Sequence, residues 1–124
     1  MRRLRLTAYA AIALSVGIAI SCSGSPREIV VIARGMTFVL ADEPAEPNPV
    51  ISMRAGERVR LVLKNEAPGL LHDLGIPAWG VQLTQIRAGE SAEVTFTVPT
   101  QTGRYEYLCR PHSELMKGVV EVTP

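Results

Sequence analysis

The sequence predicts an all-β fold, an antiparallel β-sandwich, and three observations carry that prediction. Several short segments have apolar residues at every second position, which is the period of a half-buried strand. Turn-forming residues separate these segments, and no stretch beyond the N-terminal region shows a long helical period. The alternating segments are residues 58–64, 92–98 and 105–109, and the turns lie at residues 55–57, 67–69, 88–90 and 100–103. Many short strands at this spacing are typical of two packed sheets.

The same alternation predicts which side chains face the core. Val59, Leu61 and Leu63 lie on one side of their segment, and the charged residues lie on the other. Tyr105 and Cys109 share a face of the segment at residues 105–109, so the thiol closes that strand on the side of the aromatic rings. Further strands are expected at residues 28–33, 36–40 and 118–122.

The N-terminus has the pattern of an export signal. Three arginines precede an almost purely apolar run that is shorter than a membrane span of roughly 20 residues but matches the apolar region of a signal peptide. The run ends in Ala19-Ile-Ser-Cys22, which resembles a bacterial lipobox except that such boxes usually carry Leu in place of Ala19. Ordinary cleavage nearby and an uncleaved anchor are the alternatives. We expect a lipoprotein-type signal peptide at residues 1–21, a tether at residues 22–27 and one domain at residues 28–124.

An export signal and a lipidated Cys22 would place the protein on the periplasmic or extracytoplasmic face of a bacterial membrane, and we expect it there. Removing residues 1–21 takes away three of the 13 Lys and Arg and none of the 12 Asp and Glu, which leaves a net charge of −2 with histidine neutral. No basic patch remains, so nucleic acid is not an expected partner.

One acidic, proline-rich segment, residues 42–49, interrupts the strand pattern. This composition predicts a solvated loop between strands. A Ca²⁺ site is the alternative, but three prolines stiffen the backbone and the carboxylates show no ligand periodicity.

The residues able to carry chemistry gather near the C-terminus. Cys109, His112 and Met116 offer a thiol, an imidazole and a thioether within eight residues, and His72 is the only other histidine. Two imidazoles and one thiolate with a weak axial thioether form the ligand set that selects copper for one-electron transfer. Zinc gains nothing from a thioether, and Ca²⁺ and Mg²⁺ prefer oxygen ligands. We therefore expect one copper ion at these four residues.

Each of these residues also has a plainer interpretation. An isolated Cys-x₂-His is a weak metal signal, His72 at the end of an apolar run could be a hydrogen-bonded core residue, and Met116 alone could serve packing. Cys109 adds an independent argument, because a lone thiol outside the cytoplasm oxidises unless something protects it, and a bound metal does so. A disulfide with Cys22 is disfavoured because Cys22 lies at the processing site.

The region from about residue 50 to residue 122 resembles the cupredoxins, the small blue copper proteins. Its Cys-x₂-His-x₃-Met-x-Gly motif is similar to the ligand loop of plastocyanin and amicyanin and is intermediate between them in length. The stretch from His72 to Val81, followed by Ala88-Gly-Glu90, resembles the copper domain of cytochrome oxidase subunit II. That domain has a binuclear centre with a second cysteine in the ligand loop, and this loop has one, so a mononuclear centre is implied.

The resemblance implies a Greek-key sandwich with His72, Cys109 and His112 as equatorial ligands and Met116 as the axial ligand. It also implies that the backbone N–H of Asp73 donates to the thiolate. The family usually has Asn at this position, which puts in doubt the side-chain hydrogen bond that braces the two ligand loops. His112 would expose its ring edge as the electron port. The apolar residues expected around it are Leu70, Leu71, Ile76, Pro77, Ala78, Trp79 and Leu115. Trp79 could equally pack over the core rim, and one of Leu70 and Leu71 should be core by alternation.

Three classes of function fit these observations to different degrees. The leading hypothesis is a membrane-anchored, monomeric electron carrier that serves redox protein partners such as a cytochrome or oxidase complex and binds no small-molecule substrate. The alternative is a copper-handling protein that delivers or buffers the metal for an oxidase, but such proteins favour exposed Met and His clusters. An enzyme would need an open coordination position, which Met116 is expected to fill.

Overall fold

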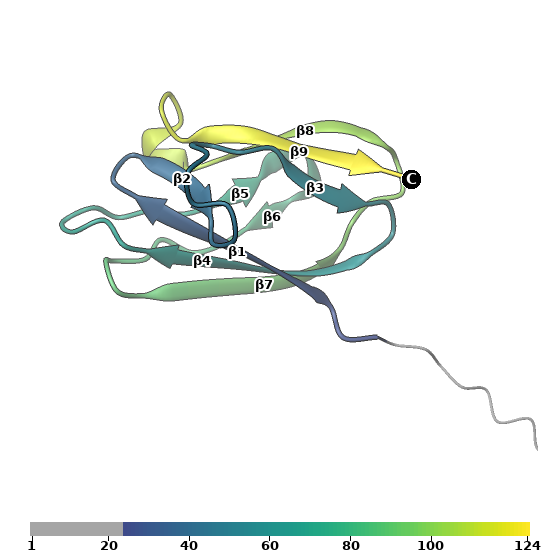
Figure 1. Ribbon diagram of the computed structural model, residues 1–124, viewed down its shortest axis with the longest axis horizontal. Coiled ribbons are helices and arrows are strands. Elements are labelled where there is room, and N and C mark those ends of the chain that lie inside the picture. Colours follow the sequence, from purple (N-terminus) through teal and green to yellow (C-terminus); the bar gives the residue numbers. More distant parts are fainter. Residues whose placement is uncertain (1–23) are drawn as a thin grey trace, which may run out of the picture.

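The computed structural model describes residues 24–124, and these form two layers of β-sheet (Figure 1). The predicted signal peptide and Cys22 lie outside the described residues. The strands are β1 (Arg27–Arg34), β2 (Thr37–Leu40), β3 (Ile51–Arg54), β4 (Arg58–Asn65), β5 (Gly75–Ile76), β6 (Val81–Gln82), β7 (Ser91–Thr97), β8 (Gly103–Leu108) and β9 (Lys117–Thr123). The helical elements between Gly24 and Pro124 are two short 3₁₀ turns, η1 (Pro77–Trp79) and η2 (Arg110–His112). No helix in this described part is long and apolar enough to cross a membrane.

The two sheets contain four and five strands. Their orders are β2-β1-β4-β7 and β3-β9-β8-β5-β6, so neighbours in space are often distant along the chain. In Figure 1 the first sheet lies below the second, and the chain passes repeatedly between them. The all-β sandwich predicted from the alternating segments is therefore confirmed.

The expectation of purely antiparallel pairing needs one refinement. Each sheet contains one parallel pair, β1 with β4 and β3 with β9. The reason is that the chain leaves the first sheet after β2 and returns to it only after running through β3. A strand that returns by such a crossover can align with the first strand in the same direction. Alternation shows which face a residue takes but not which way its neighbour runs.

The core lies between the sheets and contains the residues that alternation assigned to it. Val59, Leu61 and Leu63 of β4 are fully buried, and Val62 points to the other face. Cys109 is buried directly after β8. Burying an aliphatic side chain of this size contributes about 1.5–3 kcal/mol, so this row stabilises the sheet that faces the ligand-bearing strands.

Three strands were not predicted from the sequence. Strand β3 does alternate, with Ile51 and Met53 buried, but it spans four residues directly after the proline-rich loop. Strands β5 and β6 have two residues each, which is too short for a period to be visible. These short strands matter because β5 extends the sheet beside β8, close to the predicted ligands.

A tight contact joins the start of β9 to the end of β8. The Tyr107 ring is buried, and its hydroxyl donates to the Pro49 carbonyl at 2.7 Å. A Cβ atom on Gly118 would lie 2.4 Å from the same ring. Gly118 is not among the glycines with positive φ, so it is required by the space beneath the ring rather than by backbone freedom.

We expect Gly118→Ala to lower the free energy of unfolding by about 1–3 kcal/mol, because the ring must move to admit the methyl group. Urea denaturation of the metal-free protein measures this change. Gly118→Ala should cost less in a Tyr107→Leu background than in the wild type, because the smaller side chain leaves room for the methyl group. An unchanged denaturation midpoint for the single variant would contradict the steric interpretation.

Candidate metal centre

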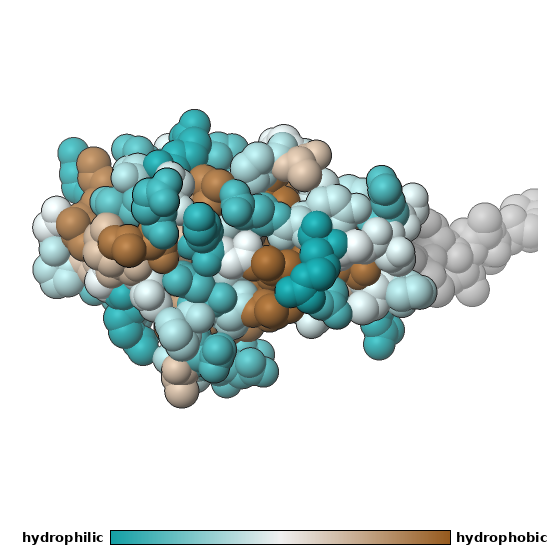
Figure 2. Space-filling view, turned by 90° about the horizontal axis from the view of Figure 1, so that it is seen from above, coloured by the Kyte–Doolittle hydropathy of each residue, from teal (hydrophilic) through white to brown (hydrophobic). Residues whose placement is uncertain are grey.

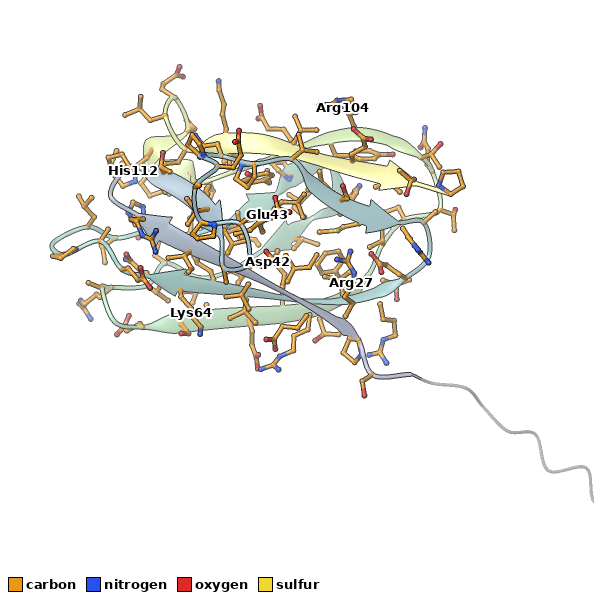
Figure 3. The ribbon with its side chains drawn as sticks, viewed as in Figure 1. Arg27, Asp42, Glu43, Lys64, Arg104 and His112 are labelled. Atoms are coloured by element: carbon orange, nitrogen blue, oxygen red, sulfur yellow. The ribbon has the colours of Figure 1, made fainter. Side chains whose placement is uncertain are left out.

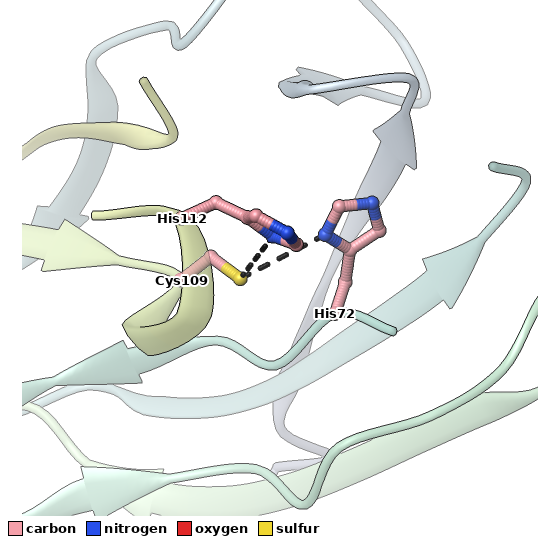
Figure 4. Close-up of side chains that lie close together, drawn as sticks. All are labelled: His72, Cys109 and His112. Atoms are coloured by element: carbon pink, nitrogen blue, oxygen red, sulfur yellow. Dashed lines mark hydrogen bonds between the residues drawn. The ribbon is translucent and has the colours of Figure 1, made fainter. Parts of the chain in front are cut away.

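Three predicted ligands converge at one end of the sandwich. The ligand atoms of His72, Cys109 and His112 all lie within 4.8 Å of one another, although His72 is 37 residues from Cys109 in sequence. The Nδ1 atoms of His72 and His112 lie 3.7 Å and 3.6 Å from the Cys109 sulfur (Figure 4). Within residues 24–124 these three side chains form the only group of His, Cys, Asp or Glu suited to a metal.

His72 lies in the segment between β4 and β5, and two sets of hydrogen bonds hold this segment in place. It forms an isolated antiparallel bridge with Ile86, in which each backbone N–H donates to the other residue's carbonyl, at 3.1 Å and 2.9 Å. Buried Asn65 at the end of β4 adds three bonds. Its amide donates to the carbonyls of Leu70 and Ile86, each at 2.9 Å, and its Oδ1 accepts from the Ala67 N–H at 2.8 Å. Asn65 was missed in the sequence analysis, although an Asn that ends a strand before a turn is a recognisable signal.

The C-terminal ligand loop closes on itself through its own backbone. The Cys109 N–H donates to the Met116 carbonyl at 2.9 Å, and the Met116 N–H donates to the His112 carbonyl at 2.9 Å. The His112 N–H in turn donates to the Cys109 carbonyl at 3.2 Å. Three of the four predicted ligands are thus bonded to one another through their peptide groups. Met116 is fully buried in this loop, and its role as the axial ligand stays a prediction.

Burial sets the protonation of the metal-free site. It lowers the pKa of His72, an effect that the neighbouring His112 increases, so the imidazole is kept neutral. Burial also raises the pKa of the Cys109 thiol, although the backbone N–H groups of Asp73 and His112 oppose this by favouring the thiolate. The Asp73 contribution agrees with the role that the family resemblance implied. Metal binding must therefore displace the thiol proton.

The donor set fits copper. Both Nδ1 atoms face the sulfur, and both His72 and Cys109 are 0% exposed. The opposite nitrogen of His72, Nε2, is buried without a hydrogen-bond partner, and the nearby Gly35 carbonyl raises the pKa of the ring without reaching hydrogen-bonding geometry. Two imidazoles and a thiol in an apolar enclosure match copper better than they match oxygen-preferring cations.

The brace between the two ligand segments is present in a charged form. The Asp73 carboxylate is fully buried and accepts the Arg110 backbone N–H at 2.8 Å on one oxygen. Its other oxygen accepts the Arg110 Nε–H at 2.9 Å. Asp73 therefore links the segment of His72 to the loop of Cys109 as an Asn could, and adds an ion pair. Arg110 was not singled out from the sequence, because nothing local marks its partner.

The surface around the site is apolar, with two corrections. Alternation placed one of Leu70 and Leu71 in the core, but neither is buried there, because both lie in the loop between β4 and β5 and not in a strand. Leu71 and Leu115 are exposed by 46% and 60%, Pro77 and Ala78 are exposed, and Leu70 is half-buried. Figure 2 shows apolar surface gathered at the left end of the molecule, which is the end where His112 lies in Figure 3. Ile76, expected in this patch, is instead buried in the core because it belongs to β5.

Trp79 packs against the rim of the core. Its ring lies 5.0 Å from Tyr105 and 6.0 Å from Phe96, measured between centroids, and it is half-buried. Of the two interpretations of this residue, the contacts support packing.

Comparison with known proteins agrees with this geometry. Residues 76–123 match the family of copper binding proteins described as plastocyanin/azurin. The matched region includes Cys109, His112 and Met116, and the structure brings His72 to them from outside it. The domain has the cupredoxin fold. The family match and the ligand group together assign it one type 1 copper ion.

Solved structures with the same fold include several copper proteins. Auracyanin B is 25% identical to this chain, with 82% of this chain and 93% of that chain covered and a TM-score of 0.63. A reduced auracyanin from the photosynthetic bacterium Roseiflexus castenholzii is 19% identical over 82% of this chain and all of that chain, with a TM-score of 0.60. A chain of a heme-copper terminal oxidase dimer is 15% identical over 90% of this chain and 78% of its own, with a TM-score of 0.64. No curated protein sequence matches significantly.

Proposed function

We propose that this cupredoxin is a one-electron carrier whose copper is held by His72, Cys109 and His112, with Met116 on the axis. The fold and the copper family make it a blue copper electron-transfer protein. The observation that carries the assignment of ligands is the triangle of one sulfur and two Nδ1 atoms, in which Cys109 and His72 are buried and His112 is half-buried. A ligand set that is already in place before copper binds needs little rearrangement when the oxidation state changes, and this suits fast electron transfer.

The structure also bears on the two other classes of function. A copper-handling protein must release its metal, but three of the four proposed ligands are fully buried and the ligand loop is bonded to itself. An enzyme needs an open coordination position, and we propose that Met116 occupies it. We therefore propose a carrier without a catalytic activity of its own.

The setting of this carrier is proposed from the sequence. Residues 1–21 would direct export, and lipidated Cys22 would anchor the domain through a tether on the extracytoplasmic face of a bacterial membrane. A membrane-anchored carrier would exchange electrons with a cytochrome or an oxidase complex in the same membrane. The apolar surface around His112, with exposed Leu71 and Leu115, supports brief docking of such a partner to the monomer.

Copper loading tests the proposed function directly. One equivalent of Cu²⁺ should give intense absorption at about 600 nm and narrow copper hyperfine splitting, the signature of a thiolate-bound blue copper site. Cys109→Ser should abolish the colour, because the sulfur supplies the charge-transfer band. A wild-type protein that stays colourless, or one with a weak tetragonal spectrum and labile metal, would favour the copper-handling role.

Met116→Leu separates the axial role from simple packing, because the two side chains have similar volumes. We expect the variant to remain blue and to have a higher reduction potential, since Cu²⁺ loses a sulfur donor that stabilised it. Voltammetry and the visible spectrum measure the two effects. An unchanged potential would show that Met116 only fills space.

A further inference from the structure

The proline-rich loop between β2 and β3 is solvated at one end and attached to the domain at the other, and its composition predicts only the first. Asp42 and Glu43 lie on this loop where it crosses the front of the sandwich (Figure 3), and they are exposed, as a solvated loop requires. The other end of the loop is different. Asn48 is only partly exposed and Pro49 is buried, so the loop is attached to the domain there.

Asn48 makes three hydrogen bonds to two different parts of the chain. Its backbone N–H donates to the Phe38 carbonyl at 2.7 Å, and its Oδ1 accepts the Phe38 N–H at 3.0 Å. Its Nδ2 donates to the Leu115 carbonyl, 67 residues away, at 3.0 Å. Asn48 also has φ of +45°, the only positive value outside glycine among the described residues. Asn is one of the few residues that tolerate this conformation.

Pro49 extends the same attachment into the core. Its carbonyl accepts the hydroxyl of buried Tyr107 in β8, the strand that leads to Cys109. Two consecutive residues of the loop thus bond to the strand before the thiol and to the loop after it. The end of the loop is therefore fixed relative to the copper site at two points.

The point at which Asn48 holds the ligand loop is specific. Leu115 lies between His112 and Met116, and its side chain is 60% exposed and anchored to nothing in the core. Its N–H donates to the His112 carbonyl at 3.0 Å, so the remaining backbone group that needs a partner is its carbonyl. Asn48 supplies that partner. The next residue, Met116, is bonded to the peptide groups of both His112 and Cys109.

We propose that Asn48 is a positioning residue of the copper site, which fixes the backbone of Leu115 and Met116 from outside the ligand loop. The inference rests on the proposed function only in that this loop carries the copper ligands. Asn48 contacts neither the metal nor its ligand atoms, and it acts through the Leu115 carbonyl. The proline-rich loop is then a fixed support of the site, because its prolines limit how far Asn48 can drift.

Asn48→Asp tests this with a minimal change. The carboxylate keeps the acceptor for the Phe38 N–H and the tolerance for positive φ, but it cannot donate to the Leu115 carbonyl. Ala45→Asp is the matched control, because it adds the same charge to an exposed position of the same loop. Amide hydrogen exchange is measured on the full-length, metal-free protein.

We expect the amides of Cys109 and Met116 to exchange about fivefold faster in Asn48→Asp than in Ala45→Asp, the factor that corresponds to about 1 kcal/mol for one hydrogen bond. Amides of β4 should be unaffected. Equal rates in the two variants, or the same acceleration in β4, would overturn the proposal. Because no metal is present, this result is independent of whether copper gives the blue site.

The spectrum of the copper-loaded protein is a second measurement, and it should not change if Asn48 serves only the stability of the fold. The charge-transfer spectrum should change in Asn48→Asp and stay as wild type in Ala45→Asp, because only the first variant frees the peptide of Met116. Asn48→Gly, which accepts positive φ without strain, should change the spectrum in the same way and covers the case in which Asn48→Asp does not fold. Wild-type spectra for both Asn48 variants would refute the positioning role.

Discussion

Asn65→Ala is expected to destabilise the metal-free protein by about 2–4 kcal/mol, a large part of the 5–15 kcal/mol that stabilises a typical domain. The buried amide of Asn65 donates to two carbonyls and accepts one N–H, and alanine replaces none of these bonds. Some of the stranded groups keep other partners, since the Ile86 carbonyl also accepts the His72 N–H. The decrease in the free energy of unfolding should therefore be smaller than the cost of leaving three buried polar groups without any partner.

The same substitution should also weaken copper binding. Asn65 holds the chain just before His72, through Ala67 and Leu70, and also bonds to Ile86, the bridge partner of His72, so its loss allows the imidazole to move away from the sulfur. Urea denaturation measures the stability, and competition with a copper chelator measures retention of the metal. Gln85→Ala, an exposed change next to Ile86 in the segment between β6 and β7, is the control. A variant that matches this control in both measurements would show that the bonds of Asn65 do not hold the site.

The second large effect is expected from the ion pair of Asp73 and Arg110. Removing the positive partner and removing the negative partner should shift the reduction potential in opposite directions. Arg110→Ala leaves the buried carboxylate without its cation, and an uncompensated negative charge near the metal stabilises Cu²⁺ over Cu⁺. The potential should fall, by roughly 40 mV for each 1 kcal/mol of differential stabilisation. The metal-free protein should lose about 1–3 kcal/mol, because the charged hydrogen bond at 2.9 Å is lost while the backbone bond at 2.8 Å remains.

Asp73→Asn is the matched variant. The amide oxygen can still accept the Arg110 backbone N–H, so the brace remains, but the negative charge is removed. The potential should therefore rise, with little change of stability, because the guanidinium is 62% exposed and can return to water. Voltammetry on both variants decides the point. Shifts of the same sign would mean that geometry, and not charge, governs the effect of this pair.

Most of the fold was predictable because alternation reports burial directly. The row Val59, Leu61 and Leu63 is buried as predicted, since a side chain on a strand takes one of two faces. The two-residue strands β5 and β6 were not predictable, because two residues contain no period. Ile76 was expected on the surface for the same reason. In the structure it belongs to β5, which pairs with β6, and its side chain is buried in the core.

The site divides in a similar way. The sequence by itself determined the chemistry of the ligand group, because the thiol, imidazole and thioether side chains carry that chemistry wherever the chain places them. Only the tertiary structure decided what holds them in place. The bonds of Asp73 to Arg110 and of Asn48 to Leu115 join residues 37 and 67 positions apart. Such contacts depend on how the two sheets pack, and no local pattern of residues encodes that packing.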